Sequence, residues 1–371
     1  MFPQGPPILA YPGRSDNARS SKSRIEAAVN IRNDLSQIPD ALRQMCKEGL
    51  PLYDALVRRF GWSQRPVFML GDGPSYPAAL AGAWAFQSLL GMPVVVERPR
   101  VFNAYTFRAL APRSLVIVVA GPHDGEETLA AAGKATRHGA AVWAITPDPA
   151  SELAALADAA VTDYSVSPAD EGSRSVFCRH AAMLFLAVAA RALKAPAKSP
   201  NPQQEDLTKL AGHVDWVLNQ VSDAARALAK QMSTLPGLYF TGGGAFYPVA
   251  LQASRRLRRF GNLSALGVEL LDFEQSLREI PQPGSGIVYL SSSRCGLREQ
   301  AHRSVRAVRQ DASRKIFAIT DGNDRQLSER ADMAILLPVL TEAGGALLSM
   351  VLLELAASYA GPPARRPPRT P

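Results

Sequence analysis

The sequence predicts a doubly wound α/β protein with two similar domains, each built on a parallel sheet with helices on both faces. Short apolar runs such as Val67–Leu70 and Leu115–Val119 alternate with helical patterns such as Ala78–Leu90. Parallel strands that are buried on both faces have this continuous, β-branched character, and helices connect them. A second observation, an internal repeat, indicates that the unit occurs twice.

The repeat keeps its order along much of the chain. Gly71–Leu80 (GDGPSYPAAL) recurs as Gly242–Leu251 (GGGAFYPVAL), at an offset of 171 residues. The other repeated segments are Ala144–Thr146 with Ala318–Thr320 and Ala157–Asp158 with Ala331–Asp332, both at an offset of 174. Ordered matches of this kind indicate an internal duplication. We expect the halves to pack around a pseudo-twofold axis that brings equivalent loops close together.

The composition along the chain suggests the domain boundaries. Residues 1–22 are rich in Pro, Gly and Ser, which predicts a disordered tail. Residues 23–197 are predicted to form the first domain, beginning with helices, and residues 198–361 the second. The Pro-rich break Lys194–Pro202 is the predicted linker. Residues 362–371 form a C-terminal tail.

The bulk composition narrows the class of protein. Of 371 residues, 47% are hydrophobic and 20% charged, as in globular proteins, and no uncharged apolar run is long enough to predict a membrane span. The N-terminus lacks a basic leader followed by an apolar run, so we expect a cytoplasmic location. The three cysteines have no paired spacing. We therefore expect no disulfide, no metal site and no cofactor.

A net charge of +8 raises the question of an anionic partner. Much of the excess lies in local clusters, and one predicted helix carries Arg255, Arg256, Arg258 and Arg259. No combined aromatic and basic motif accompanies them, so we expect no nucleic-acid partner. A sugar phosphate would use the same charge, and a solvated basic face is the alternative.

A glycine-rich loop containing Gly71, Gly73 and Ser75 lies between a predicted strand and a helix. Glycine permits positive φ and close backbone approach, and a helix N-terminus presents free N–H groups, so this loop suits a phosphate. Gly242 and Gly244 are the equivalent residues of the second half. A tight turn without a ligand is the alternative.

The loop after another strand differs between the halves. The first half has Gly121 and His123 there, and the second has Ser291, Ser292 and Ser293 followed by an arginine. Three hydroxyl groups beside a guanidinium form a candidate oxyanion cradle. Ordinary loop chemistry is the alternative for the serines. His123 and Asp124 are a candidate acid/base pair, and an exposed turn is the interpretation that we favour for them.

On these segments both halves resemble the sugar isomerase (SIS) domain, and the whole chain resembles the tandem isomerase region of glutamine–fructose-6-phosphate aminotransferase and related phosphosugar isomerases, deaminases and deglycases. The resemblance covers roughly residues 40–360. It rests on Gly71–Tyr76, Gly91–Glu97, Ser114–Leu129, Gly172–Phe177 and Gly242–Leu251. It implies a five-stranded parallel sheet in each domain, phosphosugar binding and a homodimer, with Ser75 and Ser173 among the matching hydroxyl groups.

The chain also departs from the family pattern. The family's Ser-x-Ser-Gly-x-Thr phosphate loop aligns with Ala120–Gly125, its catalytic acid with Arg259, and its nearby lysine with Arg256. Its histidine-bearing segment aligns with Asp272–Ser276. No glutaminase segment precedes the pair of domains, so we expect that the protein is not a glutamine-dependent amidotransferase.

Two functions remain open from the sequence. The first is an aldose–ketose isomerase, deaminase or deglycase acting on a sugar phosphate or amino-sugar phosphate through enediol-type proton transfer, which needs a base. The candidate bases are Glu269, Asp272, Glu274 and His180. A solvated acidic face is the alternative for the acids, and a buried helix histidine for His180. The second function is a non-catalytic phosphosugar-binding or regulatory protein.

Overall fold

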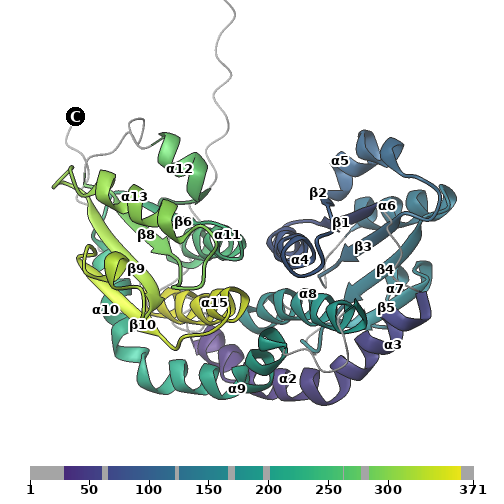
Figure 1. Ribbon diagram of the computed structural model, residues 1–371, viewed down its shortest axis with the longest axis horizontal. Helices are drawn as coiled ribbons and strands as arrows, with labels where there is room; N and C mark the ends of the chain where they lie inside the picture. Colours follow the sequence, from purple (N-terminus) through teal and green to yellow (C-terminus); the bar gives the residue numbers. More distant parts are fainter. Residues whose placement is uncertain are drawn as a thin grey trace, which may run out of the picture.

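Two α/β domains stand side by side in the computed structural model (Figure 1). The structure describes residues 29–60, 66–121, 125–165, 172–194, 201–261, 263–276 and 284–360. The predicted tails, most of the predicted linker and His123 lie outside the described residues. Figure 1 shows the domains diverging upward from a shared base, which includes helices α2 (Ile38–Gln44) and α9 (Pro202–Gln220).

The first domain contains a parallel sheet with the strand order β2-β1-β3-β4-β5. Its strands are β1 (Val67–Gly71), β2 (Val94–Glu97), β3 (Leu115–Val119), β4 (Ala141–Thr146) and β5 (Ala159–Thr162). Its helices are α3 (Leu50–Phe60), α4 (Ser75–Leu90), α5 (Pro99–Ala104), α6 (Glu126–Arg137), α7 (Glu152–Leu156) and α8 (Ser173–Lys194), with short turns η1 (Met45–Gly49) and η2 (Thr106–Ala109). Every residue of β1 and β3 is buried, as expected at the centre of a doubly covered sheet.

The second domain repeats this order as β7-β6-β8-β9-β10. Its strands are β6 (Leu238–Gly242), β7 (Ala265–Glu269), β8 (Gly286–Leu290), β9 (Lys315–Asp321) and β10 (Met333–Leu337). Its helices are α10 (Ser222–Ser233), α11 (Phe246–Arg256), the turn η3 (Leu257–Gly261), α12 (Leu270–Ser276), α13 (Arg298–Val308), α14 (Arg325–Ser328) and α15 (Glu342–Tyr359). Both sheets are five-stranded and parallel, so the predicted fold class is confirmed.

The repeated Ala-Asp dipeptide has the same structural task in both domains. The Asp158 carboxylate accepts the backbone N–H of Val142 at 2.8 Å, and the Asp332 carboxylate accepts that of Ile316 at 2.7 Å. In each domain the aspartate accepts an N–H near the start of that domain's fourth strand. A buried N–H without an acceptor would cost free energy there. A shared structural contact therefore accounts for this repeated pair.

The helices α8 and α15 form the apolar centre of the molecule. Both are long and apolar enough to cross a membrane by length and composition, and 83% and 89% of their apolar windows are buried within the protein. Helix α8 packs against α4, and α15 packs against α9, α10 and α11. A core helix of a globular domain has the same length, apolar composition and degree of burial as these two helices.

The two domains meet along α4 and α11 in a reciprocal arrangement. The Arg255 side chain of α11 lies 3.6 Å from the position that a Cβ on Gly73 would take, and the Trp84 indole of α4 lies 3.1 Å from the equivalent position on Gly244. Trp84 and Arg255 are themselves 171 residues apart, as are the two glycines. This reciprocity is the mark of a twofold relation between the halves, and it places each glycine loop at the domain junction.

Close packing of β7 on α11 leads to a testable difference between two Gly→Ala substitutions. A Cβ on Gly267 would lie 2.6 Å from the Ala250 carbonyl oxygen, whereas nothing lies within 4 Å of the Cβ position on Gly212 in α9. We expect Gly267→Ala to destabilise the protein by about 1–3 kcal/mol, because backbone must move. Gly212→Ala should stabilise it by about 0.5–1 kcal/mol. Urea unfolding measures both changes, and equal effects would contradict this packing.

Candidate functional site

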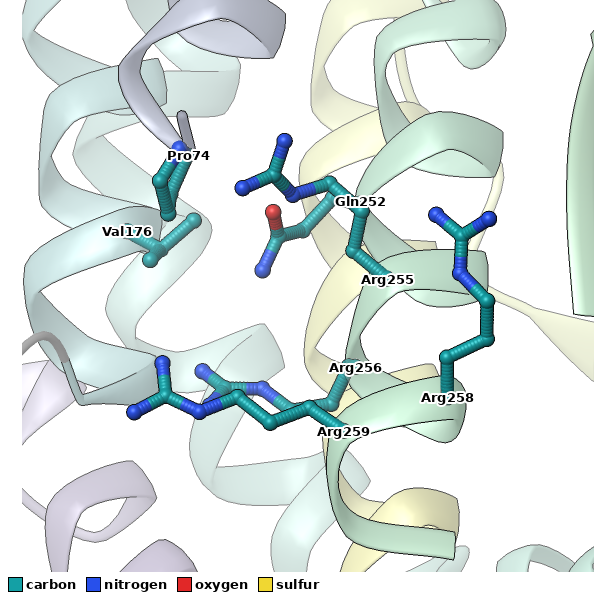
Figure 2. Close-up of a pocket in the computed structure, with 7 residues that line it drawn as sticks. All are labelled: Pro74, Val176, Gln252, Arg255, Arg256, Arg258 and Arg259. Atoms are coloured by element: carbon teal, nitrogen blue, oxygen red, sulfur yellow. The ribbon is translucent and has the colours of Figure 1, made fainter. Parts of the chain in front are cut away.

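A cavity of about 340 Å³ opens between the two domains (Figure 2). The first domain contributes Pro74, at the start of α4, and Val176 of α8. The second domain contributes the residues of α11 and η3, namely Gln252, Arg255, Arg256, Arg258 and Arg259. Four guanidinium groups stand on one wall, so the cavity is suited to an anion.

The arginines of this wall do not all point the same way. Arg255 and Arg259 are one helical turn apart, and Figure 2 shows both extending toward Pro74 and Val176, whereas Arg258 extends away from these two. Arg259 is the third residue of η3, a π-helical segment. Such segments are rare and are found frequently at functional sites. The helix thus presents two separated cationic groups to the opposite wall.

The glycine loop of the first domain lies beside this wall. Gly73 has a φ of +49°, a left-handed conformation that favours glycine. A Cβ on Gly71 would lie 2.5 Å from the Ser75 carbonyl oxygen, so the turn into α4 is tight. The Ser75 side chain is fully buried. With Arg255 over Gly73, the loop combines a helix N-terminus with a guanidinium, both of which favour an anion.

A buried polar network lies behind the cavity and includes two of the predicted binding residues. The Arg256 guanidinium forms an ion pair with Glu354 of α15, and both side chains are less than 5% exposed. The Ser173 hydroxyl donates to the Glu354 carboxylate at 2.7 Å and accepts from Arg256 at 3.2 Å. Gln252 also donates to Glu354, at 3.2 Å. The network therefore connects α8, α11 and α15, which come from both domains.

The network is extended toward the N-terminus by Asp34. Its carboxylate accepts the backbone N–H of Arg174 at 2.8 Å and lies 3.9 Å from the Arg174 side chain. Burial raises the pKa of Asp34, and the contacts with Arg174 and the charge of Arg256 oppose this rise. The N-terminus of α8 is thus held in place by contacts with two acidic side chains, Asp34 and Glu354.

In the second domain, two side chains of the protein itself, Glu342 and Trp84, lie against the equivalent loop. The Glu342 carboxylate accepts the N–H of Ala245 at 3.0 Å and that of Gly296 at 2.9 Å. Burial raises the pKa of Glu342. The Trp84 indole covers Gly244, which has a φ of +58°. An internal carboxylate and an indole therefore stand where the first domain has an open cavity and an arginine.

The three predicted cradle serines have little space around them. Ser291 and Ser292 line a cavity of only about 10 Å³. A site of this size holds at most about one water molecule. The backbone N–H and the hydroxyl of Ser293 both donate to the Asp321 carboxylate, at 2.8 and 2.9 Å. Contacts within the protein therefore stabilise this loop, and the cavity beside Ser291 and Ser292 is small.

The candidate acidic bases lie on and beside α12. The Glu269 carboxylate accepts the N–H groups of Leu271 and Asp272, so it caps the first turn of this helix. Glu274 lies 3.6 Å from Arg303. Both Asp272 and Glu269 act electrostatically on Tyr247 of α11, whose pKa is raised mainly by burial. None of the three acids lines the arginine cavity.

His180 lies inside α8 with a side chain that is 2% exposed. Its Nδ1 lies 2.8 Å from the Val176 carbonyl oxygen, which is one turn earlier. Burial lowers the pKa of His180 to about 4. The imidazole is therefore neutral at pH 7.

Gly121 lines another cavity, of about 320 Å³, in the first domain. The other residues around it are Ala120, Thr128, Leu129, Thr146, Pro147, Asp148, Ser151, Glu152 and Leu153. They lie at the ends of β3 and β4 and on α6 and α7. Gly121 therefore lines a different cavity from Arg256 and Arg259, which lie at the domain junction.

Four residues of this region were not among the predicted site residues: Gln252, Glu354, Glu342 and Trp84. Glu354 had a recognisable signal, because a lone acid within an otherwise apolar helix needs a buried partner. The sequence did not show which cation that partner is. Trp84 matters because it contacts Gly244 across the junction, and Glu342 because it accepts N–H groups from two loops of its own domain. Neither contact has a local signature in the sequence.

Comparison with known proteins gives the class of this fold. Residues 62–192 match the SIS domain family model. The chain is 23% identical over 299 residues to glutamine–fructose-6-phosphate aminotransferase [isomerizing] from Methanosarcina acetivorans, and 24% identical over 296 residues to that from Tropheryma whipplei. These matches cover 79% and 78% of the chain but 47% of each relative, so the chain spans about half the length of the curated relatives it matches.

Solved structures agree with this result. The C-terminal domain of glucosamine-fructose-6-phosphate aminotransferase from Francisella tularensis superposes with a TM-score of 0.73 at 14% identity, covering 94% of this chain and 97% of that one. Glucosamine-6-phosphate deaminase from Thermotoga maritima gives 0.68 at 15% identity, covering 89% and 93%. The first half of the chain therefore matches the SIS domain, and the whole chain has the fold of these two solved structures. The resemblance to the isomerase region of the aminotransferases is confirmed.

The Arg256–Glu354 pair should be important for stability. Glu354→Ala leaves a buried guanidinium without its counter-charge, and we expect a loss of about 3–5 kcal/mol in the free energy of unfolding. The matched control is Glu299→Ala, which removes an exposed ion pair with Arg298 and should have little effect. Denaturant unfolding of both variants tests this, and similar losses would contradict a structural role for the pair.

His180 should make the protein less stable in mild acid. Its pKa is about 4 in the folded protein and about 6.5 in the unfolded chain, so the unfolded state binds the extra proton first as the pH falls. This contribution is absent above pH 6.5 and reaches a loss of about 3 kcal/mol near pH 4. His180→Asn should flatten the fall in unfolding free energy between these values. Curves of equal slope for the two proteins would show that His180 is not the group responsible.

Proposed function

We propose that the protein binds a sugar phosphate or an amino-sugar phosphate in the arginine cavity between its domains. The observation that carries this proposal is the wall of four arginines beside the Gly71–Ser75 loop. In the proposed complex, the N-terminus of α4 and Arg255 hold the phosphate, because backbone N–H groups and a guanidinium together stabilise its charge. Gln252 and the other cavity residues are available for the sugar hydroxyl groups.

The contrast between the two halves supports the first-domain loop as the phosphate site. Glu342 already accepts N–H groups beside the second loop, and a phosphate entering there would meet a carboxylate. The Trp84 indole occupies the space over Gly244. A negative ligand is therefore favoured at Gly73 and disfavoured at Gly244.

The enzymatic form of this proposal is aldose–ketose isomerisation, deamination or deglycation through an enediol. The relatives include proteins named as a glucosamine-6-phosphate deaminase and a tagatose-6-phosphate ketose/aldose isomerase. The reaction needs a base within hydrogen-bond reach of the sugar carbon. Glu269, Asp272 and Glu274 of the α12 region and His180 of α8 are the proposed candidates, and Arg259 does not serve because guanidinium stays protonated.

A specific observation favours the second candidate function, binding without turnover. Among the described residues that line the cavity there is no carboxylate and no imidazole. Such a wall binds and orients an anion but has no group that accepts a proton at neutral pH. A non-catalytic phosphosugar-binding or regulatory protein would need no more than this. We further propose a homodimer and a cytoplasmic location, both on the basis of the family resemblance.

Binding can be tested by thermal shift with hexose, pentose and hexosamine phosphates, using the parent sugars as controls. A ligand at 100 times its Kd adds about 2.7 kcal/mol to stability, so the midpoint of unfolding should rise with the phosphorylated sugar alone. Arg255→Gln should reduce the shift, whereas Arg306→Gln, which removes an equal charge from the exposed face of α13, should not. Equal shifts with sugar and sugar phosphate would overturn the proposal.

The phosphorylated sugar that binds is then tested for turnover, which distinguishes the two candidate functions. Exchange of its C1 or C2 hydrogen with solvent, followed by NMR, reports enediol formation directly. Exchange that is lost in Glu269→Gln or Asp272→Asn supports the enzyme and identifies its base. Tight binding without any exchange supports the non-catalytic protein.

A further inference from the structure

We propose that Gln252 determines the specificity of the arginine cavity by accepting a hydrogen bond from one hydroxyl group of the bound sugar phosphate. This inference rests on the proposed function and adds a requirement to it, namely that the ligand presents a hydrogen-bond donor to the wall formed by α11. It comes from a buried acceptor atom of Gln252 that the described part of the protein leaves without a donor.

Gln252 is buried, yet one end of its amide has no partner. The residue is 4% exposed and lines the cavity from α11. Its Nε2 donates to Glu354 at 3.2 Å, whereas its Oε1 accepts no hydrogen bond within the described residues. A buried acceptor without a donor costs free energy, and native proteins rarely leave one unmatched. This exception indicates a donor that comes from outside the chain.

The orientation of the amide follows from its surroundings. Glu354 forms an ion pair with Arg256, so its carboxylate accepts hydrogen bonds and donates none. The NH₂ group of Gln252 therefore faces Glu354, and the carbonyl oxygen faces away from it. Figure 2 shows the amide extending from α11 toward Pro74 and Val176, which form the opposite wall of the cavity. The unmatched oxygen is thus placed at the cavity.

A fixed acceptor in this position restricts the ligand group that it can bind. A carbonyl oxygen pairs with a donor such as a hydroxyl group and does not pair with a phosphate oxygen, which is itself an acceptor. The other hydrogen-bonding side chains among the described lining residues are arginines, which only donate. Within this described lining, Gln252 is therefore the side chain suited to a sugar hydroxyl, while the phosphate lies at Gly73.

Ligands that differ in a single hydroxyl group test the assignment. Isothermal titration calorimetry measures the affinity for glucose 6-phosphate, for its 2-, 3- and 4-deoxyfluoro analogues, and for inorganic phosphate. Fluorine is similar to a hydroxyl group in size but donates no hydrogen bond. We expect glucose 6-phosphate to bind more tightly than inorganic phosphate. One analogue should bind about tenfold more weakly than glucose 6-phosphate, which is the scale of one hydrogen bond to a buried group.

Two variants show whether Gln252 makes this contact. Gln252→Met keeps an unbranched side chain but removes the acceptor, so glucose 6-phosphate and the weakened analogue should then bind with affinities equal within about twofold. The affinity for inorganic phosphate should stay the same, because Glu354 retains Arg256 and Ser173 as partners and the fold is kept. The matched control is Gln326→Met on the exposed α14, outside the cavity, which should retain the tenfold discrimination.

The outcomes also separate this inference from the proposed function. The assignment is wrong if all three analogues bind like glucose 6-phosphate, if Gln252→Met retains the discrimination, or if glucose 6-phosphate binds no more tightly than inorganic phosphate. Each of these results leaves the phosphate site in place. Failure of both glucose 6-phosphate and inorganic phosphate to bind overturns the phosphate site and the assignment together. One weakened analogue whose deficit disappears in Gln252→Met supports both.

Discussion

The ion pair between Arg256 and Glu354 is the contact on which the organisation of the domain junction depends. A buried guanidinium and a buried carboxylate are each expensive to remove from water, and only good geometry with further hydrogen bonds offsets that cost. Ser173 and Gln252 supply these hydrogen bonds. Because the partners come from α8, α11 and α15, satisfying the network requires all three helices to be correctly placed. That placement in turn directs the neighbouring arginines into the cavity.

The two halves show how a duplicated fold can become functionally unequal. The strand order, the Asp158 and Asp332 contacts and the glycine loops are the same in both domains. At the junction, however, α4 presents Trp84 to the second loop, and α11 presents Arg255 to the first. Glu342 then supplies the negative charge that a ligand would otherwise bring. One pseudo-symmetric site is closed by the protein's own side chains, and the other is open and positive.

The electrostatics of the open site are unusual for an acid–base catalyst. Its described lining has guanidinium groups and an amide, none of which takes up a proton at neutral pH. The one histidine of α8 is buried and has a lowered pKa, and Glu269 caps the first turn of α12. The composition of this lining fits the proposed negatively charged ligand, for a binding protein and for an enzyme alike.

The sequence by itself determined the parallel α/β class, the duplication and several elements almost to the residue. The strand at Leu115–Val119 has the predicted bounds, and α4 begins at Ser75, three residues earlier than the predicted Ala78. These features depend on local periodicity and turn chemistry, which neighbouring residues encode.

The placement of the functional side chains was decided by tertiary structure alone. Arg256 and Ser173 are matched by Glu354, and the loop at Gly244 is closed by Trp84 and Glu342, from distant parts of the chain. Which charges meet depends on how helices of different domains cross. Sequence patterns over one or two turns carry no information on that crossing, because the energy of a buried ion pair depends on its three-dimensional surroundings.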